Sequence, residues 1–153
     1  MSPFKSFLVG RFKVARRKVD QSAVDRIIEL ADRVSGDAQE LCETVWLATE
    51  DGDRIGAREI EKGLALVFAR EQRNFGEALS RLTPIQASVL KGLADPSHPK
   101  LFSGEFMSAN GVKNVGSVTR AVNRLKDEEF VYEFAGTWKF TNPFFREWLL
   151  RCP

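Results

Sequence analysis

Polar side chains recur at helical spacing between residues 114 and 126, and they are the groups best suited to chemistry in this chain. Apolar residues at Val118, Ala121, Val122 and Leu125 predict the buried face of a helix. The opposite face carries groups that bind nucleic acids, namely Asn114, Ser117, Arg120, Asn123 and Arg124, with Lys126 to one side and Lys113 just before the helix. Arginine pairs with guanine and asparagine with adenine, while serine and lysine hold phosphates. The segment therefore predicts a helix that contacts DNA.

Acidic residues around this segment argue against DNA. Asp127, Glu128 and Glu129 close the same helix and would repel phosphates if they point toward a duplex. The strands that follow contain a single base, Lys139, and we expect Glu133 to face it. A second interpretation stays open, in which the same helix and strands pack against a protein.

The elements that must position this helix follow one another in a known order. Thr83 as N-cap with Pro84 at the first helical position predicts a helix start, with Ile85, Val89, Leu90 and Leu93 facing inward. Ser103 caps a short helix that ends at Asn110-Gly111. Residues 130–134 and 137–140 alternate like two strands around Ala135-Gly136. This order, closed by an apolar helix from Pro143, predicts a winged helix-turn-helix over residues 83–153.

The first half of the chain reads as a bundle of four helices over residues 1–82. The opening helix repeats Phe4, Phe7, Leu8 and Phe12 at helical spacing, and Ser22 is a candidate cap for the second helix. Gly36 is expected to interrupt before a third helix, whose apolar side is Leu41, Cys42, Val45 and Trp46. A fourth helix is predicted from about Ala57 to Leu82. The predicted fold class is mainly α: a helical lid-like bundle followed by a winged helix-turn-helix with a small β-hairpin wing.

Composition narrows the class of protein. The chain has 153 residues, of which 43% are hydrophobic and 29% charged, as in soluble globular proteins. No apolar run reaches the roughly 18 residues of a membrane span, and the start lacks a cleavable signal, so we expect a cytoplasmic protein. His98, Cys42 and Cys152 fit neither a metal site nor a catalytic set. The chain is therefore predicted to be no enzyme and to hold no metal.

Charge is distributed unevenly along the first sixty residues. Residues 1–20 contain six Lys and Arg against one Asp, whereas residues 21–60 contain ten acids against four Arg. The basic cluster Arg11, Lys13, Arg16, Arg17 and Lys18 is a second phosphate-binding stripe, a solvated helix face, or a surface that met a nucleotide-binding domain. The acids of residues 37–59 predict a solvated surface or a docking face for a basic partner.

Four segments in this order give the chain a family resemblance. They are Ala23 to Leu30, Glu59 to Leu64, Leu82 to Gln86, and Asn142 to Phe145. With them, most of the chain resembles the C-terminal region of archaeal and bacterial AAA/STAND-type P-loop ATPases, where a helical lid is followed by a winged helix. The resemblance implies a region that couples nucleotide state to DNA or partner binding.

A further segment, Ser35-Gly36-Asp37-Ala38-Gln39, is similar to the Gly-Asp-Ala-Arg lid motif of related initiator ATPases. There the arginine senses the terminal phosphates of the nucleotide, so the resemblance implies a nucleotide-sensing role for Gly36, Asp37 and Gln39. This chain departs from the motif because Gln39 offers no charge to a phosphate. The alternative is an ordinary helix start with a glycine turn.

The sequence lacks the phosphate-binding loop G-x-x-x-x-G-K-[ST]. We therefore expect no cofactor in this chain, with ATP and Mg²⁺ confined to a P-loop ATPase core in cis or in trans. Three functions remain open: the non-catalytic C-terminal region of a P-loop ATPase, a free-standing DNA-binding regulator, and a protein-interaction module. Duplex DNA and an ATPase core are the candidate partners, and no membrane is expected.

Overall fold

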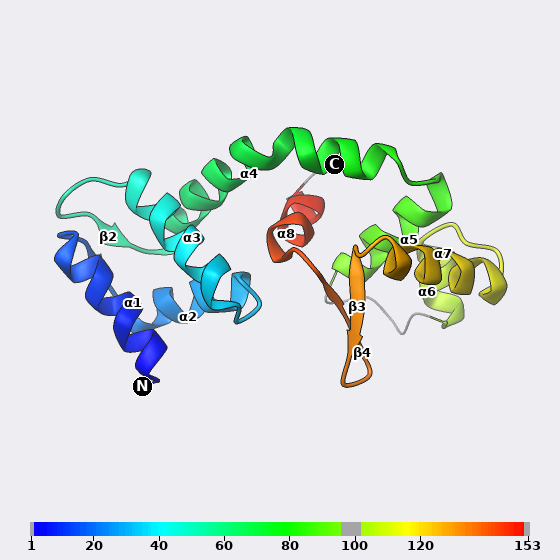
Figure 1. Ribbon diagram of the computed structural model, residues 1–153, viewed down its shortest axis with the longest axis horizontal. Helices are drawn as coiled ribbons and strands as arrows, with labels where there is room; N and C mark the ends of the chain where they lie inside the picture. The colour runs from blue at the N-terminus through cyan, green and yellow to red at the C-terminus, as the bar shows by residue number, and fades with distance from the viewer. Residues whose placement is uncertain (1, 96–101, 152–153) are drawn as a thin grey trace. The chain divides into compact units, whose positions relative to one another are not determined.

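A computed structural model describes residues 2–95 and 102–151 (Figure 1). Within these ranges the chain forms eight α-helices and two small two-stranded sheets, which confirms the mainly α fold class. Its contacts divide the chain into two compact units, Met1–Gln72 and Arg73–Pro153. This division falls inside a long helix, earlier in the chain than the boundary at 82/83 that the sequence predicts.

The first unit is built from three helices, the start of a fourth, and a short parallel sheet. Its elements are α1 (Pro3–Val14), β1 (Lys18–Val19), α2 (Gln21–Leu30), α3 (Ser35–Leu47), β2 (Arg54–Ile55) and α4 (Ala57–Ser80). In Figure 1, α1 lies beside α2 and α3, and the apolar faces of these helices supply the core. Fully buried side chains include Leu8, Val24, Ile27, Leu41 and Leu64. Gly63 allows α4 to approach α3 closely, because a Cβ built there would lie 2.4 Å from Val45 Cγ2.

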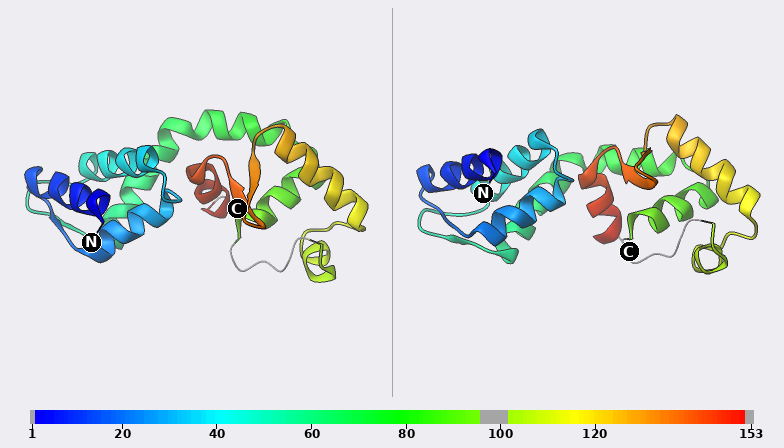
Figure 2. Two further views of the ribbon diagram at one scale, coloured as in Figure 1. Left: turned by 60° about the horizontal axis from the view of Figure 1, so that its bottom comes forward. Right: turned by 90° about the horizontal axis from the view of Figure 1, so that it is seen from below.

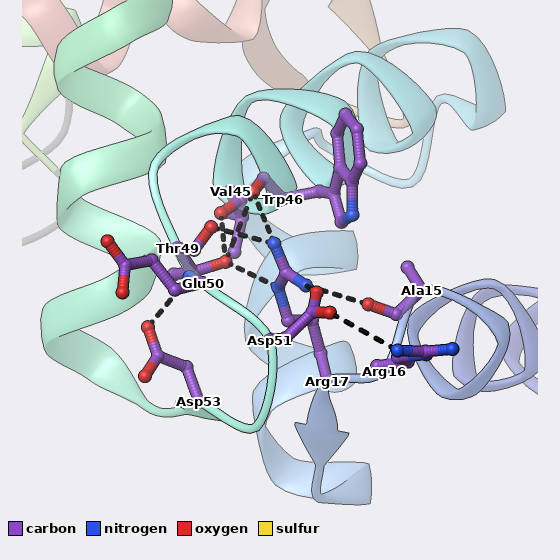
Figure 3. Close-up of polar contacts among 9 residues, drawn as sticks. All are labelled: Ala15, Arg16, Arg17, Val45, Trp46, Thr49, Glu50, Asp51 and Asp53. Atoms are coloured by element: carbon purple, nitrogen blue, oxygen red, sulfur yellow. Dashed lines mark hydrogen bonds and ion pairs between the residues drawn. The ribbon is translucent and has the colours of Figure 1, made fainter.

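A buried arginine joins the end of α1 to the end of α3 (Figure 3). Arg17 is only 6% exposed, and all three guanidinium nitrogens donate hydrogen bonds. Nε bonds Thr49 Oγ1 at 3.1 Å, and Nη2 bonds the carbonyl oxygens of Thr49 and Trp46 at 2.7 and 3.2 Å. Nη1 bonds the Ala15 carbonyl and Asp51 Oδ1, both at 2.7 Å. Because every nitrogen has a partner, the charge is buried with its donors satisfied.

This arginine also lies next to the backbone pairing that closes the unit. The amide of Gly52 donates to the Arg16 carbonyl at 2.8 Å, and that of Lys18 donates to Asp53 at 2.9 Å. The parallel pairs Lys18↔Arg54 and Val19↔Ile55 follow directly. Each strand of this parallel pair is only two residues long. Two residues are too few to show an alternation of apolar and polar side chains, so the sequence does not predict the sheet.

Several boundaries predicted for the first unit are wrong. Helix α2 begins at Gln21 with Asp20 as its N-cap residue, not at Ser22. The break between α2 and α3 lies at Asp32 and Arg33, whose φ angles of 49° and 63° turn the backbone, whereas Gly36 lies in the first turn of α3. Helix α4 runs from Ala57 to Ser80, close to the range predicted for it.

The second unit follows the predicted winged-helix order. After the end of α4 come α5 (Pro84–Ala94), α6 (Gly104–Ala109), α7 (Val115–Asp127), β3 (Val131–Phe134), β4 (Thr137–Phe140) and α8 (Pro143–Arg151). Helix α7 lies alongside α5, and β4 contacts α8 (Figure 2). Val89, Leu90, Phe106, Val118 and Leu125 are fully buried between these elements. Ile85, predicted to face inward, is instead 45% exposed because it lies in the first turn of α5.

Side-chain caps fix where α5, α6 and α7 begin. Thr83 accepts a hydrogen bond from the Gln86 amide, and the Gln86 side chain accepts from the Thr83 amide, which makes a capping box. Ser103 Oγ accepts from the Phe106 amide at 3.1 Å. Asn114 Oδ1 accepts from the Ser117 amide at 2.8 Å. Each cap satisfies an amide that the helix itself leaves without a partner.

An aromatic cluster centred on Phe145 of α8 holds the hairpin and the end of α4 together. The Phe145 ring centroid lies 5.1 Å from that of Phe75, 5.8 Å from Phe130 and 5.9 Å from Trp148. Phe140 of β4 is at 6.4 Å in an edge-on arrangement. Phe75, which the sequence assigned to the bundle of the first half, therefore packs in the second unit.

Replacement of Arg17 by alanine should destabilise the first unit by about 3 kcal/mol, because the buried Thr49 carbonyl and hydroxyl lose a charged donor. Urea unfolding followed by circular dichroism measures the change. Arg16 is the matched control, since its side chain is 81% exposed and its ion pair with Asp51 is 3.7 Å long. Arg16→Ala should change stability by less than about 0.5 kcal/mol. Equal losses in the two variants would contradict the structural role of Arg17.

Replacement of Asn114 by alanine should cost about 1 kcal/mol of stability in the second unit, because the Ser117 amide loses its acceptor. Asn114→Asp should keep the stability, since a carboxylate caps the same amide and suits the positive end of the helix. Tryptophan fluorescence during urea unfolding, recorded in a Trp46→Phe background, reports the second unit through Trp138 and Trp148. An alanine variant as stable as the parent would show that the cap contributes nothing.

Candidate nucleic-acid interface

Helix α7 presents one apolar and one polar face, as the sequence predicts. Val118, Ala121, Val122 and Leu125 are buried against the rest of the unit, which confirms the predicted inward set. Arg120, Asn123, Arg124 and Lys126 are exposed. The buried face fixes the rotation of α7 about its own axis, and these four side chains therefore point to solvent. Their role in DNA contact stays a prediction.

The candidate contact residues differ in how much of their bonding capacity is already used. Asn114 Oδ1 is occupied by the cap, and Ser117, which is half-buried, accepts from Arg120 Nη2 at 3.3 Å. Arg124 Nη2 lies 2.6 Å from Glu128 Oε1 in an exposed ion pair. Asn123 and Lys126 make no side-chain hydrogen bond or ion pair within the described residues. Arg120, Asn123 and Lys126 are therefore the groups most available to a ligand.

Charge changes along α7. Lys113 precedes the helix and Arg120 lies in its middle, whereas Asp127 is its last residue and Glu128 its C-cap. A separation of seven residues places Asp127 about 10 Å from Arg120 along the axis. Glu129 follows with a φ of 62°, which turns the chain out of the helix. The N-terminal half of a recognition helix is the part that reaches base edges, and here that half carries no acid.

The hairpin that forms the wing is tight and exposes aromatic side chains. Ala135 and Gly136 have φ angles of 50° and 76°, as in the two-residue turns that suit hairpins. Tyr132 is 41% exposed and Phe134 62% exposed, and Lys139 Nζ lies 5.7 Å from the Phe134 ring centroid. In the sequence, the alternation of Tyr132 and Phe134 predicts a strand. It does not indicate that both aromatic side chains are exposed on one face. The expectation that Glu133 faces Lys139 is wrong, because the register pairs Glu133 with Trp138 and Lys139 with Tyr132.

The three residues implied in nucleotide sensing lie together in the first turns of α3. Gly36 and Gln39 are exposed, and Asp37 is half-buried. Burial raises the pKa of Asp37 above its ordinary value, which disfavours the charged form. Gln39 also lines a groove between α1 and α3. Their role toward a nucleotide stays a prediction.

Groups that act in catalysis or metal binding are sparse among the described residues. Cys42 is buried, and burial raises the pKa of its thiol to about 12, so it stays protonated near neutral pH. No group of three or more His, Cys, Asp and Glu in residues 2–95 and 102–151 is placed to hold a metal ion. The other candidates named from sequence, His98 and Cys152, lie outside the described residues.

In the part of the chain that the structure describes, no helix is long and apolar enough to span a membrane.

Comparisons with known proteins give one match to a family and several to curated relatives. The relatives include uridylate kinases of Escherichia coli K12, Escherichia coli O157:H7 and Shigella flexneri, each 33% identical over 132 residues, or 83% of this chain. The chain spans about half the length of these relatives, 48% in each. No solved structure matches. The model of the family described as "Probable winged helix domain" matches residues 73–151, which contain the end of α4 and all of α5 to α8. By that match, the chain belongs to the probable winged helix domain family.

Proposed function

We propose that the winged-helix unit binds duplex DNA, with α7 in the major groove. The observation that carries this proposal is the exposed polar face of α7, on which Arg120, Asn123 and Lys126 have few or no partners of their own. Winged helices commonly bind DNA by inserting the helix in this position.

Each side chain has a role that follows from its chemistry. Arg120 and Asn123 are three residues apart and lie on one face, where the guanidinium suits guanine and the amide suits adenine. Lys113 and Lys126 flank this face and hold phosphates as point charges. Arg124 leaves its ion pair with Glu128 and binds a phosphate instead, because the duplex attracts the guanidinium more strongly than one carboxylate does. An exposed ion pair of this kind contributes little stability, so the exchange costs little.

A second candidate function is protein binding through the wing. The exposed face of the hairpin offers two aromatic side chains, Tyr132 and Phe134, and such rings are frequent at protein interfaces. Glu128 and Glu129, which precede the hairpin in the chain, disfavour a phosphate backbone beside them. The two functions use different elements of one unit and therefore respond to different substitutions.

We further propose that this chain works with a P-loop ATPase core, in cis or in trans, that sets its affinity for DNA or a partner. The resemblance of its helical segments to ATPase lids supports this view. The curated relatives are named as kinases and are about twice as long as the matched region, which is compatible with a nucleotide-binding part elsewhere. Nucleotide binding in the core would change the lid and re-aim the winged helix, as in other domain-closure switches.

The double variant Arg120→Ala/Asn123→Ala should bind a 30-base-pair mixed-sequence duplex at least about fivefold more weakly than the parent, because two base-edge contacts are lost. Fluorescence anisotropy across a salt series measures both the affinity and the number of phosphates contacted. Arg73→Ala is the control for loss of charge, since its side chain is 90% exposed and belongs to α4 at the start of the same unit, not to α7. Its affinity should stay within about twofold of the parent.

Two outcomes would contradict the DNA proposal. Unchanged binding in the double variant would remove α7 from the interface. No binding of the parent at low salt would favour the second candidate, and Tyr132→Ser/Phe134→Ser would then be the variant to test against protein partners.

Coupling to an ATPase predicts a nucleotide-dependent affinity. In a complex of this chain with its ATPase core, duplex affinity should differ at least about fivefold between a non-hydrolysable ATP analogue and ADP. The same anisotropy titration measures it, with this chain alone as the control that shows no nucleotide effect. Equal affinities in the two nucleotide states would contradict the coupling.

A further inference from the structure

A groove in the first unit takes no part in the proposed contact with DNA. It lies between α1 and α3 and has a volume of about 710 Å³. Its lining includes Phe7, Gly10 and Arg11 from α1, and Gln39, Cys42 and Trp46 from α3. This volume is within the range of ligand-binding sites, and the groove is about half open to solvent.

Large apolar side chains are exposed along the groove. Phe7 is 48% exposed, Trp46 43% and Val14 87%. The sequence assigned Phe7 and Trp46 to apolar helix faces, and within the described residues no element covers the outer part of either side chain. A cluster of exposed aromatic and aliphatic side chains around one concave surface marks an interaction site.

The spacing of the lining residues matches the shape of a helix. Phe7, Arg11 and Val14 follow one another at i, i+4 and i+7 on α1, and Gln39, Cys42 and Trp46 at i, i+3 and i+7 on α3. Each set forms a ridge two turns long, about 10 Å. Two parallel ridges with a groove between them are what a third helix packs against.

Charge on the α1 side of the groove is not neutralised. Lys5 pairs with Asp25 and Arg16 with Asp51, whereas Arg11 and Lys13 form no ion pair within the described residues. Arg11 instead lies over the Phe7 ring, 5.9 Å from its centroid. On the α3 side, Glu43 is engaged by Arg70 at 3.6 Å. The groove therefore has the positive charge of Arg11, without an ion-pair partner among the described residues, beside an apolar lining.

We propose that this groove binds an amphipathic α-helix of a partner protein, with acidic residues on the side that meets Arg11. Apolar side chains at i, i+3 or i+4 and i+7 enter between Phe7 and Trp46, as in other helix-in-groove complexes. The acid beside this stripe forms the ion pair that Arg11 lacks. The inference is independent of DNA binding, because every residue involved lies in the first unit.

Gly10 provides a way to fill the groove without disturbing the fold. It lies in the middle of α1 and lines the groove, and a Cβ built there meets nothing within 4 Å. Leucine at this position would extend into the space a ligand needs. Leucine also has a higher helix propensity than glycine, so Gly10→Leu should fold at least as well as the parent.

Two designed peptides of 18 residues test the proposal. Both carry leucine at i, i+3, i+4 and i+7; one has glutamate and the other lysine along one flank. Titrated into the isotope-labelled full chain, the glutamate peptide should shift amide resonances of α1 and α3 and bind at least about tenfold more tightly than the lysine peptide. Arg11→Glu should reverse this preference, which a purely hydrophobic association would not do.

Matched glycine variants identify the site. Gly10→Leu should lower the affinity of the glutamate peptide at least about tenfold, whereas Gly76→Leu should leave it unchanged. Gly76 is also inside a helix with nothing within 4 Å of a built Cβ, but it does not line the groove.

Four results would overturn the proposal. They are no shift with either peptide, unchanged binding in Gly10→Leu, binding of dodecanoate at the groove without binding of the peptide, and a concentration-dependent dimer that Gly10→Leu abolishes. The last two results would assign the groove to a small amphiphilic anion or to a second copy of this chain.

Discussion

The guanidinium of Arg17 is the group on which the arrangement of the first unit depends. It is buried, yet five hydrogen bonds satisfy it, and their acceptors come from the end of α1, the end of α3 and the turn before β2. A charge so far from water is stable only with this full set of partners. The Arg17 guanidinium carbon also lies 5.7 Å from the centroid of the Trp46 ring. Arg17 therefore connects the turn before β2 with Trp46, a side chain that lines the groove.

The second unit is held by apolar contacts instead. Phe145 packs against rings from α4, β4 and the segment before β3, so the hairpin is anchored at its base while its outer face stays exposed. The buried face of α7 fixes which side chains point to solvent. Stability and recognition are thereby separated in this unit, because the residues proposed to meet DNA carry little of the packing. Substitutions on the polar face of α7 can alter binding without unfolding the protein.

The sequence predicted the second unit more completely than the first. Helix caps at Thr83 and Ser103 and the turn at Ala135-Gly136 are local signals, because each acts over three or four residues. Arg17 was read as one member of a basic cluster, since burial depends on contacts with Thr49 and Asp51, more than thirty residues away. The break at Asp32 and Arg33 was missed for a related reason. Left-handed backbone at non-glycine residues has no strong sequence signal, whereas the nearby Gly36 has an obvious one that proved misleading.

For the candidate interface, periodicity identified the exposed residues of α7 but not their existing bonds. The use of Asn114 as a cap and the pairing of Arg124 with Glu128 depend on side-chain geometry, and they reduce the set available to DNA. The groove between α1 and α3 had no sequence signal of its own. Phe7 and Trp46 look like core residues at helical spacing, and only the packing of the helices leaves them half-exposed.

The position of Phe145 in the chain has a consequence for synthesis on the ribosome. Helices α5 to α7 carry their own caps and can form as soon as they emerge, since helix formation takes microseconds or less and translation adds about 5–20 residues per second. The ring that joins the hairpin to the end of α4 belongs to α8, which is made after all of them. Phe75, Phe130 and Phe140 therefore lack this ring as a partner until α8 leaves the exit tunnel. During that interval of seconds the nascent unit exposes the aromatic surface that α8 later covers.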